Sequence, residues 1–178
     1  MLSPAETVIA QVIHQVRNGG DIAALTGVCK ALIAEDDRLA AEGEAQATNR
    51  AKLLNQTGAD AGFSIKAAAA NLQNRRVLDH DFIKTHTAGF EAFADYCRSV
   101  PWDEIERASG LSRDVLAGVA AEYAKAERVM AIYGMGLTQH VAGVQNIQMV
   151  VNLLLLRGNI GKAGAGVSPR RCQCRRTR

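Results

Sequence analysis

The chain has 178 residues, 48% of them hydrophobic and 22% charged, which is typical of an ordered globular domain or of one piece of a larger one. Five arginines lie within the last nine residues, namely Arg170, Arg171, Arg175, Arg176 and Arg178. Without these five, the 21 basic residues fall to 16, against 18 acidic ones. The body of the chain therefore lacks the basic excess of a general nucleic-acid-binding surface, and we expect no nucleic-acid partner.

The cysteines and histidines do not follow metal-ligand patterns. No C-x-x-C pair and no histidine at zinc-finger spacing occurs among the four cysteines, Cys29, Cys97, Cys172 and Cys174. His80 and His86 are six residues apart, and this spacing does not put two imidazoles on one helical face. We expect no metal ligand in this chain, buried or stray thiols, and histidines in capping or surface hydrogen bonds.

The N-terminal sequence has no basic leader followed by an apolar region. The longest apolar run, interrupted by Asn152, is far shorter than the roughly 20 residues that span a bilayer. These features predict a cytoplasmic protein without a membrane span.

The first third of the chain predicts one helix and one exposed insertion. Residues 3–17 fit a short helix or strand, and the glycines at 19–20 fit a turn. Asp21 can cap a helix that should end near Glu35. The composition then shifts to Ala, Gln, Asn, Glu and Lys with weak apolar periodicity, so residues 38–74 predict an exposed helical insertion or hairpin.

The middle of the chain predicts four short helices. Asp79 caps the first, Gly89 separates it from the second, Pro101 begins the third and Ser112 begins the fourth. In the fourth helix, apolar residues recur with helical spacing at Leu116, Val119, Ala120 and Tyr123.

The segment RVMAIYG has the β-branched and aromatic content of a short buried strand, and a helix from about Ala142 to Arg157 is predicted after it. Gly134 and Gly136 lie between the two. In such α/β units ligands gather at the carboxyl end of the strand, where glycines permit positive φ or close approach of a ligand. This turn is therefore the candidate site for a nucleotide or phosphate.

Two other interpretations of the turn remain open. A standard NAD site fits poorly, because Gln139 stands where the third glycine of G-x-G-x-x-G is expected and no acidic residue follows to hold a ribose. The absence of Asp and Glu from Arg128 to Arg178 suits a ligand with several phosphates. Alternatively, the turn merely closes a strand–helix connection.

The string GMGLTQH, followed by NLLLLRGNIGKAGAGVSPRR, closely resembles the molybdopterin oxidoreductases of the formate dehydrogenase alpha-subunit type. In these proteins a GMGxTQ turn leads through a helix to NLxLLxGNIGKxGAGxxPVRG. The segments RNGGDIAALTGVCKALI, VLDHDFIKTHTAGFEAFA and WDEIERASGLSRDVL are similar to the central region of the same family. The resemblance covers nearly the whole chain apart from about residues 38–74.

The resemblance implies a helix-rich α/β fold with few, mostly parallel strands, as an incomplete part of a multi-domain enzyme. Residues 1–169 would be a partial central domain and residues 170–178 an aberrant Arg-rich tail. The chain would contribute part of the site for bis(molybdopterin guanine dinucleotide) carrying molybdenum or tungsten, in an oxidoreductase acting on a small molecule. The alternative is a noncatalytic remnant or partner-binding fragment without a cofactor.

The family motifs also imply site residues in two loops. The first cofactor loop would contain Gly134, Met135, Gly136, Thr138 and Gln139. The second would contain Asn159, Gly161, Lys162, Gly164 and Gly166, and would end at Pro169. His140 and Arg171 would be the catalytic candidates, one for proton transfer and the other beside phosphate or an anionic substrate. Asn152 is expected to hydrogen-bond a neighbouring loop.

The chain departs from the family pattern at its C-terminus and in its cysteines. After Pro169 the expected VRGHSNVQGDRT is replaced by RRCQCRRTR, which suggests a truncated or frameshifted product. The ligands for the family's 4Fe–4S cluster and the cysteine or selenocysteine that binds the metal are missing from this chain. We therefore expect the isolated chain to be inactive.

Overall fold

The structure is a computed structural model and describes residues 12–57 and 76–169. These residues form a helix-rich α/β fold, as the sequence predicts. The elements in chain order are α1 (Asp21–Thr57), α3 (His80–His86), α4 (Phe90–Ser99), α5 (Trp102–Ser109), α6 (Arg113–Lys125), β1 (Met130–Tyr133), α7 (Met135–Thr138), α8 (Gly143–Leu155) and β2 (Gly166–Pro169). None of the described helices is long and apolar enough to cross a membrane.

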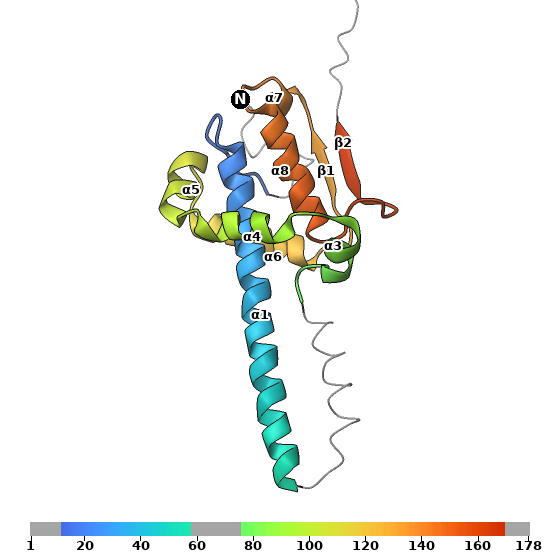
Figure 1. Cartoon of the computed structure of the whole chain (residues 1–178). Helices are drawn as coiled ribbons and strands as arrows, with labels where there is room; N and C mark the ends of the chain where they lie inside the picture. The colour runs from blue at the N-terminus through green and yellow to red at the C-terminus, as the bar shows by residue number, and fades with distance from the viewer. Residues whose placement is uncertain (1–11, 58–75, 170–178) are drawn as a thin grey trace, which may run out of the picture.

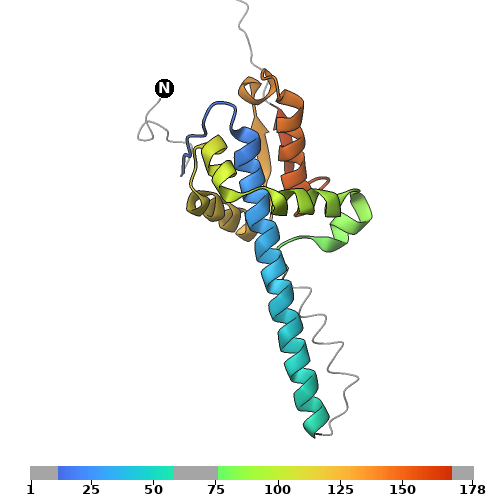
Figure 2. The same cartoon turned by 60° about the vertical axis from the view of Figure 1, so that its left-hand side comes forward.

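Helix α1 is the central element of the fold. Its first half packs against α4, α5, α6 and α8, while its second half extends away from the body (Figures 1 and 2). The apolar core lies around the first half and includes Leu32, Ile33, Ile105 and Leu116. These apolar side chains from three helices are buried together, and their burial stabilises the bundle.

The predicted end of the first helix near Glu35 is wrong, because α1 continues to Thr57. Good helix formers follow Glu35, and Arg38 pairs with Glu35 and Glu42 one turn away on either side. Such i, i+3 and i, i+4 pairs support a helix that leaves its packing partners behind. Residues 38–57 are thus a continuation of α1, and the rest of the predicted insertion lies outside the described residues.

The four short helices begin where the sequence predicts. The Asp79 carboxylate accepts a hydrogen bond from the Phe82 amide at 3.0 Å, and the Ser112 hydroxyl accepts one from the Val115 amide at 3.4 Å. Gly89 has φ +77°, a left-handed conformation that favours glycine. Residues 12–17 contain no regular secondary structure, and residues 3–11 of the predicted first element lie outside the described part.

A buried carboxylate joins α1 to the segment that leads into α3. Asp36 accepts hydrogen bonds from Arg76 at 2.5 and 3.0 Å, from His80 at 2.7 Å, and from the amides of Val77 and Leu78 at 2.9 and 3.1 Å. Burial opposes ionisation of Asp36, but these hydrogen bonds and the charge of His80 outweigh it and lower its pKa. His80 is therefore part of a partly buried network and not only a surface residue.

Strands β1 and β2 form a parallel pair in the register Met130 to Gly166 and Tyr133 to Pro169. The prediction of a buried strand is wrong for β1, because Met130 is 52% and Ile132 is 61% exposed. Parallel strands are usually covered on both faces, which is why they are rich in apolar residues. The described part of the chain leaves the face that carries these two side chains open to solvent.

Candidate functional site

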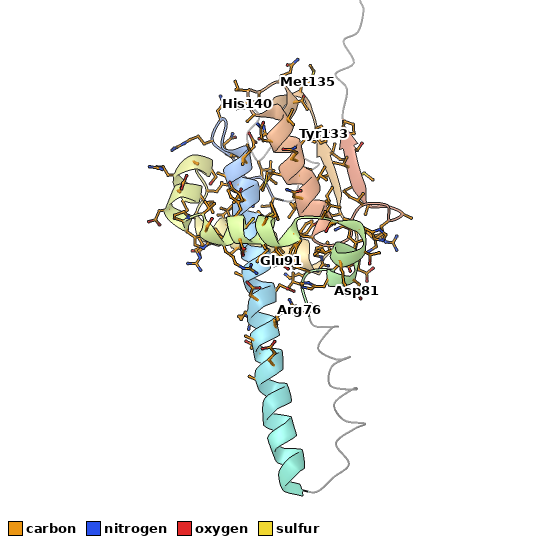
Figure 3. All side chains as sticks on the ribbon, in the orientation of Figure 1. Arg76, Asp81, Glu91, Tyr133, Met135 and His140 are labelled. Atoms are coloured by element: carbon orange, nitrogen blue, oxygen red, sulfur yellow. The ribbon has the colours of Figure 1, made fainter. Side chains whose placement is uncertain are left out.

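The candidate site is the edge of the sheet where both strands end. Because β1 and β2 are parallel, Tyr133 and Pro169 are neighbours at this edge, and the Gly134 turn follows directly. Figure 3 shows Tyr133, Met135 and His140 together at this end of the molecule, far from Arg76 and Asp81. The structure thus places the first predicted loop, which begins at Gly134, next to Pro169, the last described residue of the second loop.

The space beside the two glycines of the turn is open. Gly134 has φ −126°, and Gly136 lies within α7, so neither has the positive φ that glycine permits. A Cβ added to either glycine would meet no heavy atom within 4 Å. The sequence predicts glycine here either for a positive φ or for the close approach of a ligand. The first explanation is wrong, and the open space leaves the second.

Gly143 is the glycine that the local fold requires. A Cβ at Gly143 would lie 2.5 Å from the Thr138 carbonyl oxygen, far inside van der Waals contact. The turn thus folds back tightly onto the first residue of α8. The buried Asn146 secures this contact, since its side-chain amide donates to the Leu137 carbonyl at 3.1 Å. The sequence predicts that Asn152 hydrogen-bonds a neighbouring loop. In the structure Asn146, which was not predicted, makes such a bond to the Gly134–His140 turn.

Polar side chains follow the glycines. Thr138, Gln139 and His140 are exposed to solvent. Nδ1 of His140 accepts a hydrogen bond from the Ala142 amide at 3.2 Å. An imidazole that accepts at Nδ1 carries its proton at Nε2 when neutral. In this neutral form His140 can donate a hydrogen bond from Nε2, at the edge of the candidate site.

The second predicted loop lies mainly at the opposite edge of the sheet. It leads into β2, whose first residue, Gly166, pairs with the first residue of β1, Met130. Four-residue strands separate the two edges by roughly 10 Å. Gly161, Gly164 and Gly166 have φ values of +77°, +78° and +133°, so the backbone of this loop itself calls for glycine.

Asn159 of the second loop is buried and fully engaged within the protein. Its Oδ1 accepts from the Val129 amide at 3.2 Å, and its Nδ2 donates to the Tyr123 hydroxyl at 3.1 Å. That hydroxyl donates to the Leu153 carbonyl at 2.8 Å. Burial raises the pKa of Tyr123 to about 12, although the hydrogen bond from Asn159 acts in the other direction. These bonds join α6, α8 and the beginning of β1.

The described cations near the sheet lie at the edge of the second loop and not beside the Gly134 turn. Exposed Arg128 lies beside Gly164, and Lys162 donates to the Glu127 carbonyl at 2.6 Å, so both cations belong to the far edge. Arg171 lies outside the described residues.

Cys29 and Cys97 are buried, as expected, and burial raises the pKa of both thiols. No group of three His, Cys, Asp or Glu side chains that could hold a metal occurs within residues 12–57 and 76–169.

The sequence of this chain is similar to segments of several known proteins. No protein-family model matches the chain. Protein YdeP of Escherichia coli K12 is 40% identical over 171 residues, which are 96% of this chain and 19% of YdeP. An uncharacterized oxidoreductase of Mycobacterium tuberculosis H37Rv is 31% identical over 161 residues, 90% of this chain and 16% of the relative. The F420-dependent formate dehydrogenase subunit alpha of Methanocaldococcus jannaschii is 36% identical over 97 residues, 54% of this chain and 14% of the relative.

The chain is related to oxidoreductases. Formate dehydrogenase alpha subunits are among these relatives, which suggests a family of enzymes that use a redox cofactor. The chain spans at most 19% of the length of the three relatives described.

Proposed function

We propose that the chain is a segment of a molybdopterin-dependent oxidoreductase resembling formate dehydrogenase. In this proposal, the edge formed by Gly134–His140 and Pro169 is one wall of the site for bis(molybdopterin guanine dinucleotide). The observation that carries the proposal is the open backbone of Gly134 and Gly136 at the carboxyl end of a parallel strand, where α/β proteins bind nucleotides. The oxidoreductase relatives support the same class of protein.

The described residues fit the pterin part of this cofactor. The uncovered backbone at Gly134 and Gly136 leaves room for a flat ring system, and exposed Thr138 and Gln139 offer donors and acceptors to its edge. The bound group would supply two-electron redox chemistry at its metal. His140 would hold a proton at Nε2 beside it, while a role for Arg171 stays a prediction.

The two predicted loops have different parts in this proposal. Gly134–Gln139 would contact the cofactor directly. Asn159 would hold the framework, because both ends of its side-chain amide already have partners. Gly161, Lys162, Gly164 and Gly166 could reach the same ligand only if it extended past the whole length of β1, as a dinucleotide can.

A second candidate is a noncatalytic, partner-binding segment. It is favoured by apolar side chains that are exposed on and beside the sheet, namely Met130, Ile132, Met135, Val141, Val144 and Val167. Exposed apolar patches of this kind mark protein–protein contacts or aggregation. This candidate predicts binding of other polypeptide without any cofactor.

A segment exchange separates the two candidates. The chain replaces the matching segment of the Escherichia coli relative, which supplies the remaining four fifths of the polypeptide. Molybdenum and pterin are measured in the purified hybrid, with the unmodified relative as control. We expect both to be retained in the hybrid, and the chain of residues 1–178 alone to hold no stoichiometric molybdenum.

Three variants of the hybrid test the turn. Gly136→Val should abolish cofactor loading, and Gln139→Ala should weaken its retention. Gly118→Val is the matched control, because Gly118 on α6 also has no heavy atom within 4 Å of an added Cβ but lies away from the site. Equal loading in all three variants, or no molybdenum in the unmodified relative, would contradict the proposal.

A further inference from the structure

His80 forms a carboxylate–imidazole pair on the part of the molecule that carries Arg76 and Asp81, far from the Gly134 turn (Figure 3). Its Nε2 lies 2.7 Å from Oδ2 of Asp36, whose side chain is only 2% exposed. An unprotonated nitrogen and a carboxylate oxygen are both acceptors and would repel at this distance, so Nε2 carries the proton. Arg76, which can only donate, gives its hydrogen bonds to the same carboxylate. The neutral ring of His80 therefore has an unprotonated Nδ1.

This Nδ1 is available to a ligand. It has no hydrogen-bond partner within the described part of the chain, and 39% of the His80 side chain is exposed. The ring lines a cavity of about 550 Å³, a volume typical of small-molecule sites. Since Asp36 holds Nε2 and does not line this cavity, Nδ1 is the nitrogen that a ligand in the cavity can use.

Two cations on the wall of this cavity have no carboxylate partner within residues 12–57 and 76–169. The Arg157 guanidinium donates to the carbonyl of Val77 at 2.7 Å and to that of Ala126 at 3.1 Å. The Lys162 ammonium donates to the carbonyl of Glu127, the next residue, at 2.6 Å. These bonds bring both cations to one short stretch of the chain. Arginine has five N–H donors and the lysine ammonium has three, so both cations keep donors for a ligand.

We infer that this cavity is a second ligand site, which binds a small phosphate monoanion, either free phosphate or a phosphomonoester. Arg157 and Lys162 donate to the phosphate oxygens, and Nδ1 of His80 accepts a hydrogen bond from the P–OH group. The inference does not rest on the function proposed above, because no residue of the Gly134–His140 turn lines the cavity.

The acidic residues of the cavity explain why the ligand is a monoanion. Three exposed carboxylates also line the wall, namely those of Asp79, Asp81 and Glu127. Like charges repel, so these carboxylates disfavour a dianion. A phosphate dianion also lacks the O–H group that the unprotonated Nδ1 of His80 needs.

The test is NMR of the full chain labelled with ¹⁵N-histidine and titrated with inorganic phosphate at neutral pH, with the His80 signals assigned by their loss in His80→Gln. We expect the Nε2-protonated tautomer before the titration. Phosphate should then shift Nδ1 of His80 in a saturable way, and sulfate, which has no O–H group at this pH, should shift it less. His86 is exposed on the same helix but does not line the cavity, so its signals should stay in place.

Two lysine variants test the cationic part of the site. Lys162→Gln should raise the phosphate concentration at half of the shift about tenfold, because one hydrogen bond to a charged donor is lost. Lys125→Gln is the matched control, since Lys125 is an exposed lysine close to the same stretch but pairs with Glu122 and does not line the cavity. Glycerol phosphate, titrated in the same way, identifies a phosphomonoester as the ligand if it saturates at a lower concentration than inorganic phosphate, and free phosphate if it does not.

Four results would each overturn the inference. They are an Nδ1-protonated His80 in the free protein, no saturable shift, an equal shift with sulfate, and equal binding by Lys162→Gln and Lys125→Gln. None of these results depends on the molybdenum content of the hybrid protein, so the inference and the proposed function can fail separately.

Discussion

Two glycines only seven residues apart should respond in opposite ways to the same substitution. Alanine at Gly143 would place its Cβ 2.5 Å from the carbonyl oxygen and 3.2 Å from the carbonyl carbon of Thr138. Both are backbone atoms, so the clash can be relieved only by moving the turn away from α8. Alanine at Gly136 would meet no heavy atom within 4 Å.

The magnitudes follow from these contacts. Overpacking typically costs about 1–3 kcal/mol, and alanine regains about 0.5–1 kcal/mol over glycine within a helix. Gly143→Ala should therefore lower the free energy of unfolding by about 0.5–2 kcal/mol. Gly136→Ala should leave it unchanged or raise it by up to about 1 kcal/mol, because only the helical gain applies.

Urea unfolding followed by circular dichroism measures both variants against the wild type, and equal slopes with denaturant confirm that the same transition is compared. A loss of more than about 1 kcal/mol for Gly136→Ala, or none for Gly143→Ala, would refute the description of the turn. If both expectations hold, a side chain at position 136 does not destabilise the fold. A loss of cofactor loading in Gly136→Val would then result from a clash with the ligand and not from misfolding.

Two further predictions concern buried polar groups. Asp36→Ala should cost about 3 kcal/mol, because it leaves Arg76 and two amides without their acceptor, whereas Asp37→Ala at an exposed ion pair should cost at most about 1 kcal/mol. Since the folded-state pKa of Asp36 is lowered, its contribution to stability is present above the unfolded pKa, near 4, and is lost as pH falls through the folded pKa. Urea unfolding between neutral and acid pH should therefore show the free energies of unfolding of the wild type and Asp36→Ala converging as pH falls. A constant difference between these two proteins would contradict this. Tyr123→Phe should cost about 1–3 kcal/mol, and a double-mutant cycle with Asn159→Ala should give a coupling of at least about 0.5 kcal/mol, so additive losses would argue against the buried hydrogen bond.

Local features of the fold could be predicted from the sequence because neighbouring residues determine them. Asp79 and Ser112 cap helices through amides three residues away, and Gly89 adopts the left-handed conformation at a helix boundary. The strand, turn and helix between residues 130 and 155 also follow from local apolar spacing and glycines. The end of α1 was missed, because no strong stop signal follows Glu35.

The arrangement of the site was decided by contacts between distant residues. The parallel register of β1 and β2 sends most of the two predicted loops to opposite edges, and no local pattern encodes a register. The sequence does not distinguish the structural roles of Asn159 and Asn152. In the structure, Asn159 is buried and donates to the Tyr123 hydroxyl, so it stabilises the packing around the site. Asp36 and Arg76 are 40 residues apart in sequence, and their ion pair exists only after α1 and the segment that leads into α3 have come together.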